Sequence, residues 1–350
     1  MTLPIPEVDR LQQRSDRAAP IAGRATLANT VAPLLTVEEL RVEFPSRDVT
    51  LVAVDGVSFS ITPGEVLGVV GESGAGKSVT GAAVIGLIDP PGRIAGGRIM
   101  LGDRRIDNLP PEAMRRVRGR EIGAVFQDPL TSLNPLYTVG RQLIETITTH
   151  LDLSPRAAHK RALELLAEVG IPAPKRRIDQ YPHQFSGGMR QRVVIALALA
   201  ASPKLIIADE PTTALDVSIQ AQIIMLLKRL CRDHGTAVML ITHDMGVIAE
   251  TADRVAVMYA GRIVEIGPVS DVIHRPAHPY TRGLMGSIPS IAADRESLAQ
   301  IDGTMPRLNA IPPGCAFHPR CPHVFDRCRR ERPELMPVGP TFAACWLHVH

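Results

Sequence analysis

The sequence predicts an α/β fold with a parallel core sheet. Short, continuous apolar runs at residues 66–70, 122–126, 205–208 and 238–242 are typical of strands that are buried on both faces of a sheet. Helical patterns separate these runs, as in residues 218–230, where apolar side chains recur along one face. Strands that alternate with helices are joined by crossover connections, so we expect them to lie parallel.

Two earlier runs, at residues 34–44 and 52–61, predict an antiparallel β subdomain. Each run alternates apolar and polar residues, which is typical of a strand with one solvated face. A polar turn at residues 46–48 separates them, so we expect a hairpin.

Helical spacing replaces the strand signal between residues 135 and 183. Residues 157–169 carry apolar side chains at helical intervals, and Gly170 follows them as a stop signal. We interpret the segment at about residues 130–185 as a helical subdomain that is inserted into the α/β domain.

The two ends of the chain differ in composition from its middle. Residues 1–33 mix Pro, Ala, Arg and Asp without an apolar segment, so we expect a disordered tail and no secretory signal. Prolines punctuate the sequence from residue 268 onward, which predicts a separate C-terminal module at residues 268–350. The main domain would then span residues 34–267.

Charge and hydropathy argue against two classes of protein. The chain of 350 residues carries 39 Lys and Arg against 36 Asp and Glu, a net charge of +3, which does not indicate a nucleic-acid partner. Its longest unbroken apolar stretch, residues 193–201, is far shorter than the ~20 residues that a membrane-spanning helix needs. We therefore expect a globular chain that does not itself cross a bilayer.

A glycine-rich loop follows the first buried run directly. Residues 71–78 read Gly-Glu-Ser-Gly-Ala-Gly-Lys-Ser and fit the pattern G-x-x-x-x-G-K-[ST] between a predicted strand and a predicted helix. The glycines let backbone N–H groups converge on phosphate oxygens, and the helix N-terminus favours their negative charge. In such a loop Lys77 reaches the β- and γ-phosphates and Ser78 binds Mg²⁺. The loop alone predicts a nucleotide-phosphate site and no particular reaction.

Polar side chains follow three other predicted strands. Asp209 and Glu210 end one apolar run, at the sheet edge where ligands of open α/β sheets gather. Asp209 suits the Mg²⁺ shell, and Glu210 suits orientation of an attacking water. Gln127 and His243 follow the other two runs and would bring an amide and an imidazole beside a γ-phosphate. Each of these residues, taken alone, is more often a satisfied surface group.

A second loop leads into an apolar helix at residues 186–189, which read Ser-Gly-Gly-Met. Backbone donors at a helix N-terminus suit anion binding. An ordinary helix cap is the alternative, and it would explain these residues if they stood alone.

Together these motifs resemble the ATP-binding cassette (ABC) ATPases over residues 34–267. The resemblance assigns residues 71–78 to the Walker A loop, Gln127 to the Q-loop, Asp209 and Glu210 to Walker B, and His243 to the switch histidine. It assigns the signature and the D-loop to Ser186, Gly187, Gly188 and Met189, and to Ala214, Leu215 and Asp216. The signature variant Phe-Ser-Gly-Gly-Met and a His-Pro-Tyr-Thr-Arg-Gly-Leu stretch that begins at His278 are similar to the oligopeptide and dipeptide importer branch.

The resemblance also implies roles for single residues. It implies a catalytic set of Glu210, His243 and Gln127, and a Mg²⁺ shell of Ser78, Gln127 and Asp209. It implies ATP contacts from an adenine-stacking aromatic residue, from the Walker A loop and from the residue after it: Phe44, Gly71, Glu72, Ser73, Gly74, Ala75, Gly76, Lys77, Ser78 and Val79. A half-buried strand residue is the alternative for Phe44.

In this family two cassettes bind head to tail, so that the signature of one caps the ATP held by the other. The resemblance therefore implies a second ABC ATPase subunit, expected as a related chain, with a second copy as the open alternative. It also implies two transmembrane permease subunits and an extracytoplasmic solute-binding protein, with this chain at the cytoplasmic face of the inner membrane. The helical subdomain around residues 136–183 would couple to the permeases.

The implied activity is ATP hydrolysis that powers uptake of dipeptides or oligopeptides. The same subunit could serve an importer of nickel, oligosaccharides or another solute, because cargo contacts belong to other chains. A relative that acts on DNA or ribosomes is the remaining alternative. Such a relative carries a long coiled coil between the glycine loop and the signature, or a second cassette, and the sequence contains neither.

Four of the five cysteines gather late in the chain: Cys315, Cys321, Cys328 and Cys345. Their spacing lacks the C-x2-C pairs of a zinc ribbon and matches no standard ferredoxin run, so spacing alone leaves zinc, a [4Fe-4S] cluster and unligated thiols open. The peptide-importer ATPases that this chain resembles carry a motif of the form seen at residues 315–322, and this resemblance implies an iron–sulfur cluster. Cys231 stands alone on a predicted helix, where we expect a small core residue.

Overall fold

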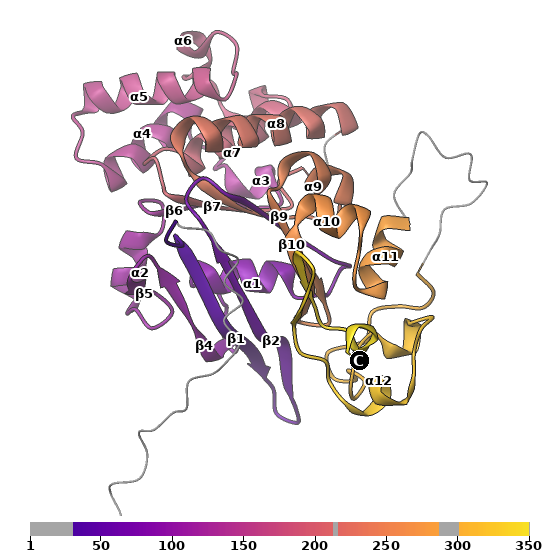
Figure 1. The fold of residues 1–350 in the computed structure, drawn as a ribbon. Helices are drawn as coiled ribbons and strands as arrows, with labels where there is room; N and C mark the ends of the chain where they lie inside the picture. Colours follow the sequence, from indigo (N-terminus) through magenta and orange to yellow (C-terminus); the bar gives the residue numbers. More distant parts are fainter. Residues whose placement is uncertain (1–30, 213–215, 287–300, 350) are drawn as a thin grey trace, which may run out of the picture. The chain divides into compact units, whose positions relative to one another are not determined.

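The computed structural model describes residues 31–212, 216–286 and 301–349 (Figure 1). Of the expected tail, only residues 31–33 fall within this part, and residues 1–30 lie outside the described residues. The expectation of a disordered tail therefore stays a prediction.

Five parallel strands form the predicted core sheet. They are β3 (Val66–Val70), β6 (Ile122–Val125), β7 (Leu205–Asp209), β8 (Ala237–Ile241) and β9 (Arg254–Tyr259). Their order is β9-β3-β8-β7-β6, and each neighbouring pair is parallel. The carboxyl ends of these strands meet at one edge of the sheet, so the loops that follow them lie side by side.

The second sheet is four-stranded and antiparallel. It consists of β1 (Leu35–Pro45), β2 (Thr50–Ile61), β4 (Arg93–Leu101) and β5 (Arg104–Arg105), in the order β2-β1-β4-β5. The expected hairpin is formed by β1 and β2, with Leu35 opposite Ile61 and Phe44 opposite Leu51. The predicted antiparallel β subdomain is therefore confirmed.

Side chains of the core strands alternate between two hydrophobic clusters. In β3, Leu67 and Val69 pack with α1 (Lys77–Val84) and the antiparallel sheet, whereas Val66 and Val70 belong to the other cluster. β7 alternates in the same way. The core sheet thus lies between two apolar layers, and polar side chains are tolerated only where its strands end.

Most of the helices cover the second of these clusters, whereas Met114 and Val117 belong to the first. In the described part of the chain up to residue 251, the α-helices besides α1 are α2 (Pro111–Val117), α3 (Pro129–Ser132), α4 (Val139–His150), α5 (Pro155–Glu168), α6 (Pro174–Arg177), α7 (Gly187–Ala198), α8 (Val217–His234) and α9 (Met245–Thr251). Figure 1 shows α4, α5 and α6 grouped at the top, beyond α7 and α8. The expected helical subdomain is therefore present. In the described part of the chain, no helix is both long enough and apolar enough to cross a membrane.

Capping residues explain where the subdomain helices begin and end. Thr138 accepts the backbone N–H of Arg141 at 3.2 Å at the start of α4, and Ser154 accepts that of Ala157 at 3.3 Å at the start of α5. Gly170 follows α5 with a φ of +76°, a left-handed conformation that commonly ends a helix. The predicted stop at Gly170 is confirmed.

The C-terminal part of the chain adds strands to the core sheet. Its elements are β10 (Arg262–Pro268), α10 (Val269–His274), α11 (Pro279–Gly286), α12 (Asp326–Arg330), β11 (Met336–Val338) and β12 (Thr341–Ala343). β10 pairs with β9 and with β12, and β11 pairs with β12, so the sheet has eight strands. The chain from Val31 onward forms one compact unit. The independence of residues 268–350 as a module stays a prediction.

Ile147→Ala should destabilise the helical subdomain. Ile147 on α4 is fully buried, so truncation removes apolar contacts and leaves a cavity, at a cost of about 2–5 kcal/mol. Urea unfolding followed by circular dichroism would measure the loss. Ile144→Ala on the same helix is the matched control, because that side chain is only partly buried and should cost clearly less. Equal losses for the two variants would contradict this packing.

Candidate functional site

The glycine-rich loop joins β3 to α1 and leaves no room for side chains at two of its glycines. A Cβ at Gly71 would lie 2.2 Å from the carbonyl oxygen of Met258, and one at Gly76 would lie 2.7 Å from that of Ala53. Both glycines also have positive φ, +149° and +98°. The Lys77 ammonium donates to the carbonyl oxygen of Gly71 at 2.8 Å, so the loop closes around the lysine.

Lys77 is buried and Asp209 is half-buried near the end of the sheet, where their charges interact. Burial lowers the pKa of Lys77, although the charges of Glu210, Asp209 and Glu72 oppose the shift. Burial raises the pKa of Asp209, and the neighbouring Glu210 charge adds to the rise, whereas the Ser78 hydroxyl lowers it by donating to Asp209 Oδ1 at 3.0 Å. Because these groups have lost part of their hydration, the charged form of each depends on the polar and charged side chains around it.

The carboxylate of Glu210 connects three strand ends. Its Oε2 accepts from Gln127 Nε2 at 3.3 Å, and its Oε1 lies 3.2 Å from His243 Nδ1. Gln127 follows β6, Glu210 follows β7 and His243 comes after β8, so the parallel sheet brings together residues that are distant in the sequence. Glu210 has a φ of +45°, a strained conformation for a residue with a side chain and one that is concentrated at functional sites.

Of the three residues expected to bind Mg²⁺, two lie close enough together to share an ion. Ser78 and Asp209 are within hydrogen-bond distance and offer the hard oxygen ligands that Mg²⁺ prefers. Gln127 makes its contact with Glu210, and no described hydrogen bond joins it to Ser78 or Asp209. The Ser78–Asp209 pair fits the ion on this basis.

The signature residues stand apart from the loop. Ser186 caps α7 by accepting the backbone N–H of Met189 at 3.4 Å, which agrees with the helix-cap interpretation. Ser186 and Gly187 are exposed, and a Cβ at Gly188 would meet Ile219 at 2.7 Å. Within the described ranges, no hydrogen bond or ion pair joins residues 186–189 to residues 71–78. In the described part of the chain, the signature therefore makes no polar contact with the phosphate loop.

The other sequence-derived residues have less defined surroundings. Phe44 is half-buried near the end of β1, where its ring lies against Gly92. Val79 is half-buried on α1, and Ser73 and Gly74 are exposed at the tip of the loop. Of the expected D-loop, Ala214 and Leu215 lie outside the described residues, whereas Asp216 is exposed immediately before α8.

The four late cysteines line one small cavity, although they are spread over 31 positions: Cys315, Cys321, Cys328 and Cys345. His278, Phe317, His318 and Trp346 complete much of its wall. Burial raises the pKa of the Cys315 thiol to about 11 and also raises those of Cys321 and Cys345. Among the described His, Cys, Asp and Glu side chains, no group of three or more could hold a metal ion as it stands.

Cys231 differs from these thiols. It is 2% exposed on α8 and belongs to the hydrophobic cluster, as the sequence predicts. Burial raises its pKa to about 12, which keeps the thiol protonated and unreactive.

Sequence reasoning missed the residues that hold Glu72. Its backbone N–H donates to the Tyr280 hydroxyl at 2.9 Å, and its carboxylate accepts from Arg320 Nη1 at 3.0 Å. Tyr280 belongs to the stretch singled out as typical of the peptide-importer branch, but that stretch carried no signal for a contact more than 200 positions away. No local pattern pointed to Arg320.

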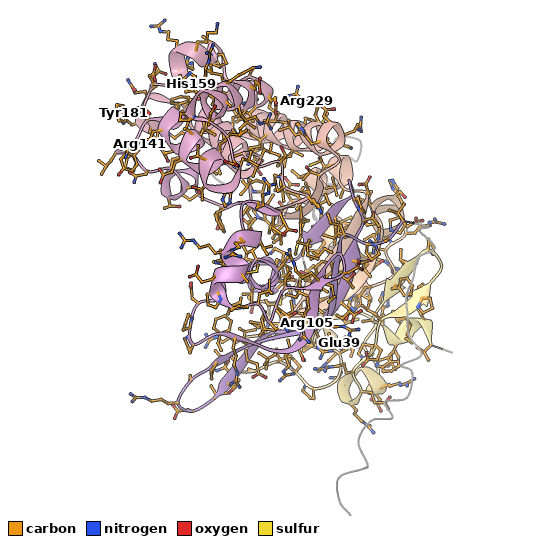
Figure 2. The ribbon with its side chains drawn as sticks, turned by 90° about the vertical axis from the view of Figure 1, so that its left-hand side faces the viewer. Glu39, Arg105, Arg141, His159, Tyr181 and Arg229 are labelled. Atoms are coloured by element: carbon orange, nitrogen blue, oxygen red, sulfur yellow. The ribbon has the colours of Figure 1, made fainter. Side chains whose placement is uncertain are left out.

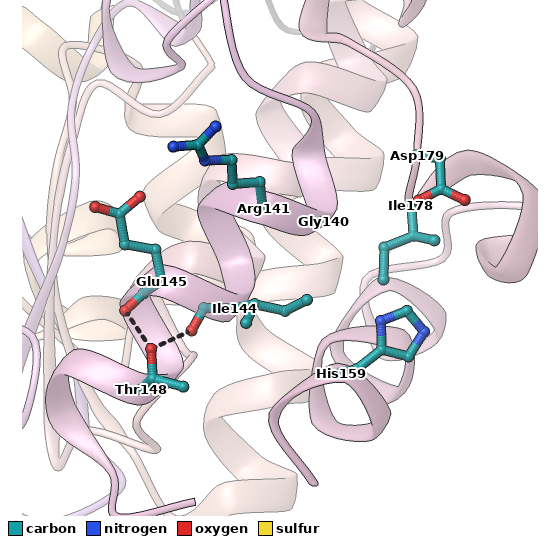
Figure 3. A pocket seen from close by; sticks show the side chains of 8 residues that line it. All are labelled: Gly140, Arg141, Ile144, Glu145, Thr148, His159, Ile178 and Asp179. Atoms are coloured by element: carbon teal, nitrogen blue, oxygen red, sulfur yellow. Dashed lines mark hydrogen bonds between the residues drawn. The ribbon is translucent and has the colours of Figure 1, made fainter. Parts of the chain in front are cut away.

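A wider cavity lies on the helical subdomain, away from the strand ends (Figure 3). It is formed by α4, α5 and the segment after α6, and its lining is mixed: Gly140, Arg141, Ile144, Glu145, Thr148, His159, Ile178 and Asp179. The Thr148 hydroxyl donates within its own helix, to the carbonyl oxygens of Ile144 at 2.9 Å and Glu145 at 3.2 Å. None of the strand-end residues described above lines it.

Comparisons with known proteins agree with this arrangement. Residues 54–213 match the family described as ABC transporter, and residues 264–328 match the family described as oligopeptide/dipeptide transporter, C-terminal region. The matched segments contain the phosphate loop, the Glu210 contacts with Gln127, and three of the four late cysteines.

Relatives cover nearly the whole chain. The dipeptide transport ATP-binding protein DppD of Bacillus subtilis is 49% identical over 316 residues, which are 90% of this chain and 94% of that protein. The oligopeptide transport ATP-binding protein OppD of Escherichia coli is 48% identical over 300 residues, 86% of this chain and 89% of that protein. A solved dimeric, post-hydrolysis structure of the ATP-binding cassette MJ0796, bound to ADP and Pi, has a TM-score of 0.61 and 28% identity, covering 67% of this chain and 98% of that one. The chain therefore belongs to the ATP-binding proteins of ABC transporters, in the branch that carries the oligopeptide/dipeptide transporter C-terminal region.

Proposed function

We propose that this chain hydrolyses ATP to power the import of dipeptides or oligopeptides. The observation that carries the ATPase assignment is the Glu210 carboxylate, which contacts both Gln127 and His243 beside the Ser78–Asp209 pair. A carboxylate that is fixed between an amide and an imidazole suits the orientation of an attacking water.

We assign the remaining roles from the same geometry. The phosphate loop and Lys77 bind the β- and γ-phosphates, and Ser78 and Asp209 hold Mg²⁺. When bound, Mg²⁺ supplies positive charge that neutralises the phosphate oxygens. A cation beside Asp209 also favours its ionised form, against the rise in pKa that burial causes. Gln127 and His243 orient Glu210, and would lie beside the γ-phosphate.

The active assembly that we propose contains two cassettes. Ser186 and Gly187 at the N-terminus of α7 are exposed, so the backbone donors there are available to ATP that is held by a partner. A related second chain is the partner that we favour, and the residues at the D-loop would adjoin the same interface.

Two permeases and an extracytoplasmic solute-binding protein would complete the importer, with this chain at the cytoplasmic face of the membrane. The coupling surface that we propose is the outer part of the helical subdomain, where Arg141, His159 and Tyr181 project (Figure 2). Leu136 is 78% exposed and Tyr181 is 40% exposed in this subdomain, so both side chains are accessible to a partner.

Peptide cargo is supported by the names of the relatives and by the match of the C-terminal region. Nickel or another solute is the second candidate for the cargo. The described site contacts nucleotide and carries no cargo-binding feature, so the choice depends on the other subunits.

Glu210→Gln should abolish most ATP hydrolysis and retain ATP binding. The amide keeps the size of the side chain but cannot act as a base toward water, so we expect turnover to fall at least about 100-fold. Phosphate release by the assembled complex and the affinity for a fluorescent ATP analogue are the two measurements. Glu112→Gln is the control, because Glu112 is exposed on α2 and distant from the strand ends. Unchanged turnover in Glu210→Gln would remove Glu210 from the mechanism.

Transport assays should identify the cargo. The chain would be purified with its permeases and second cassette, reconstituted in vesicles with the binding protein, and supplied with labelled dipeptides, longer peptides or nickel. We expect ATP-dependent accumulation of peptides, and none in a complex that carries Glu210→Gln. Accumulation of nickel without peptides would contradict the proposed cargo while leaving the ATPase assignment intact.

We also propose a [4Fe-4S] cluster at the four late cysteines. All four thiols line one cavity, which supports a shared ligand there. Four cysteines suit either zinc or an iron–sulfur cluster. We favour the cluster because of the resemblance of residues 315–322 to the peptide-importer ATPases, and the cluster would serve a structural purpose.

Purification without air should yield about four irons and four sulfides per chain. Iron, sulfide and zinc would be measured in the wild type, in Cys328→Ser and in Cys231→Ala. Loss of iron is expected only in Cys328→Ser, because Cys231 belongs to the hydrophobic cluster on α8. Zinc at one equivalent without iron would reject the cluster.

A further inference from the structure

Glu72, the second residue of the phosphate loop, is held at all of its polar groups. Its backbone N–H donates to Tyr280 Oη at 2.9 Å, and its carbonyl oxygen accepts from Lys77 Nζ at 3.0 Å. Its two carboxylate oxygens accept from Arg320 Nη1 at 3.0 and 3.1 Å. Tyr280 and Arg320 belong to the C-terminal part of the chain, and together they fix both the backbone and the side chain of Glu72.

Arg320 is itself held rigidly. Its side chain is 7% exposed, and its Nε donates to the carbonyl oxygen of Asp302 at 2.8 Å. Its Nη2 donates to the carbonyl oxygens of Ile301 and Gly303, both at 3.3 Å. The guanidinium carbon lies 5.9 Å from the ring centre of Tyr259, within range of a cation–π interaction. An arginine fixed in this way can impose a position on its carboxylate partner, which an exposed ion pair does not do.

Tyr280 is also held in place by its contacts. It is fully buried, and its ring meets that of Tyr259 edge-on with 4.7 Å between the centres. Its backbone N–H donates to His278 Nδ1 at 3.1 Å, and the backbone N–H of His278 donates to the buried carboxylate of Glu265 on β10 at 2.9 Å. A continuous set of contacts therefore runs from the core sheet to the phosphate loop.

We infer that Arg320 and Tyr280 are positioning residues for ATP binding, which act through Glu72; this inference rests on the proposed ATPase function. Because the Glu72 carboxylate turns to Arg320, the loop keeps its backbone shape, and a negative charge beside the bound phosphates is neutralised. The segment that carries Arg320 also carries Cys315 and Cys321, so the cysteine-lined part of the chain reaches the phosphate loop.

Two explanations of the Arg320–Glu72 pair give different results in a double variant. If the pair sets the position of the loop, Arg320→Met and Glu72→Gln each weaken ATP binding, and the double variant stays weak. If the pair only neutralises charge, the double variant regains wild-type affinity, because no unpaired charge remains. Arg320→Met keeps the apolar stem that packs beside Tyr259 and Phe317 and removes the donors.

The affinity of the full-length chain for a fluorescent Mg–ATP analogue tests the inference. We expect the dissociation constant to rise about tenfold in Arg320→Met, as the loss of a charge-assisted hydrogen bond predicts, and to stay raised in the double variant. In the assembled complex, the KM for ATP should rise by a similar factor, while turnover at saturating ATP stays within about twofold of wild type.

Arg332→Met is the matched control. Arg332 belongs to the same C-terminal part but pairs with Asp55 at 2.9 Å, and no described ion pair or hydrogen bond joins it to residues 71–78, so its loss should leave ATP affinity unchanged. Tyr280→Phe keeps the buried ring and removes only the hydroxyl that Glu72 contacts, and it should also weaken ATP binding. Tyr280→Phe serves as the test variant if Arg320→Met fails to fold.

Wild-type affinity in folded Arg320→Met, or its recovery in the double variant, would overturn the inference. Failure of the wild-type chain to bind the analogue would instead overturn the proposed function.

Discussion

Burial of the core strands on both faces is the constraint on which the rest of the structure depends. β3 and β8 have no exposed residue, and an ionised group within either strand would lose its hydration without gaining a partner. In the five parallel strands, charged and amide side chains are therefore confined to the strand ends. Because the strands are parallel, their ends coincide, and the sheet brings together Gln127 and Glu210 across 83 positions of sequence.

The closed conformation of the phosphate loop also affects how a nucleotide can bind. Lys77 donates to the carbonyl oxygens of Gly71 and Glu72, which leaves one of the three N–H donors of its ammonium for a phosphate oxygen. The two carbonyl contacts hold the ammonium in place, so the gain from binding depends on keeping the loop in shape. The strained φ of Glu210 fits this view, because a residue held in an unfavourable conformation needs a surrounding structure that is fixed beforehand.

Much of the fold and site could be predicted because the signals are local. Apolar runs, the glycine loop and the stop at Gly170 each lie within a few residues, and the strand-end positions of Glu210 and His243 follow from them. Strand limits were less accurate: Phe126 was expected in a strand, but β6 ends at Val125 and Phe126 is 46% exposed. The contact of Arg320 with Glu72 spans 248 positions and depends on tertiary packing, which no periodicity encodes.

The hairpin of β11 and β12 has a consequence for solubility. A sheet that ended at β10 would leave a seven-residue strand with unpaired backbone groups, which is a template for association with other chains. The hairpin moves the boundary of the sheet to β11, which has only three residues and carries Pro337 at its centre. A proline has no N–H to donate, and so short a strand offers little to pair with. Where β12 pairs with β10, at Glu265 and Ile266, the sheet is therefore protected against intermolecular strand addition.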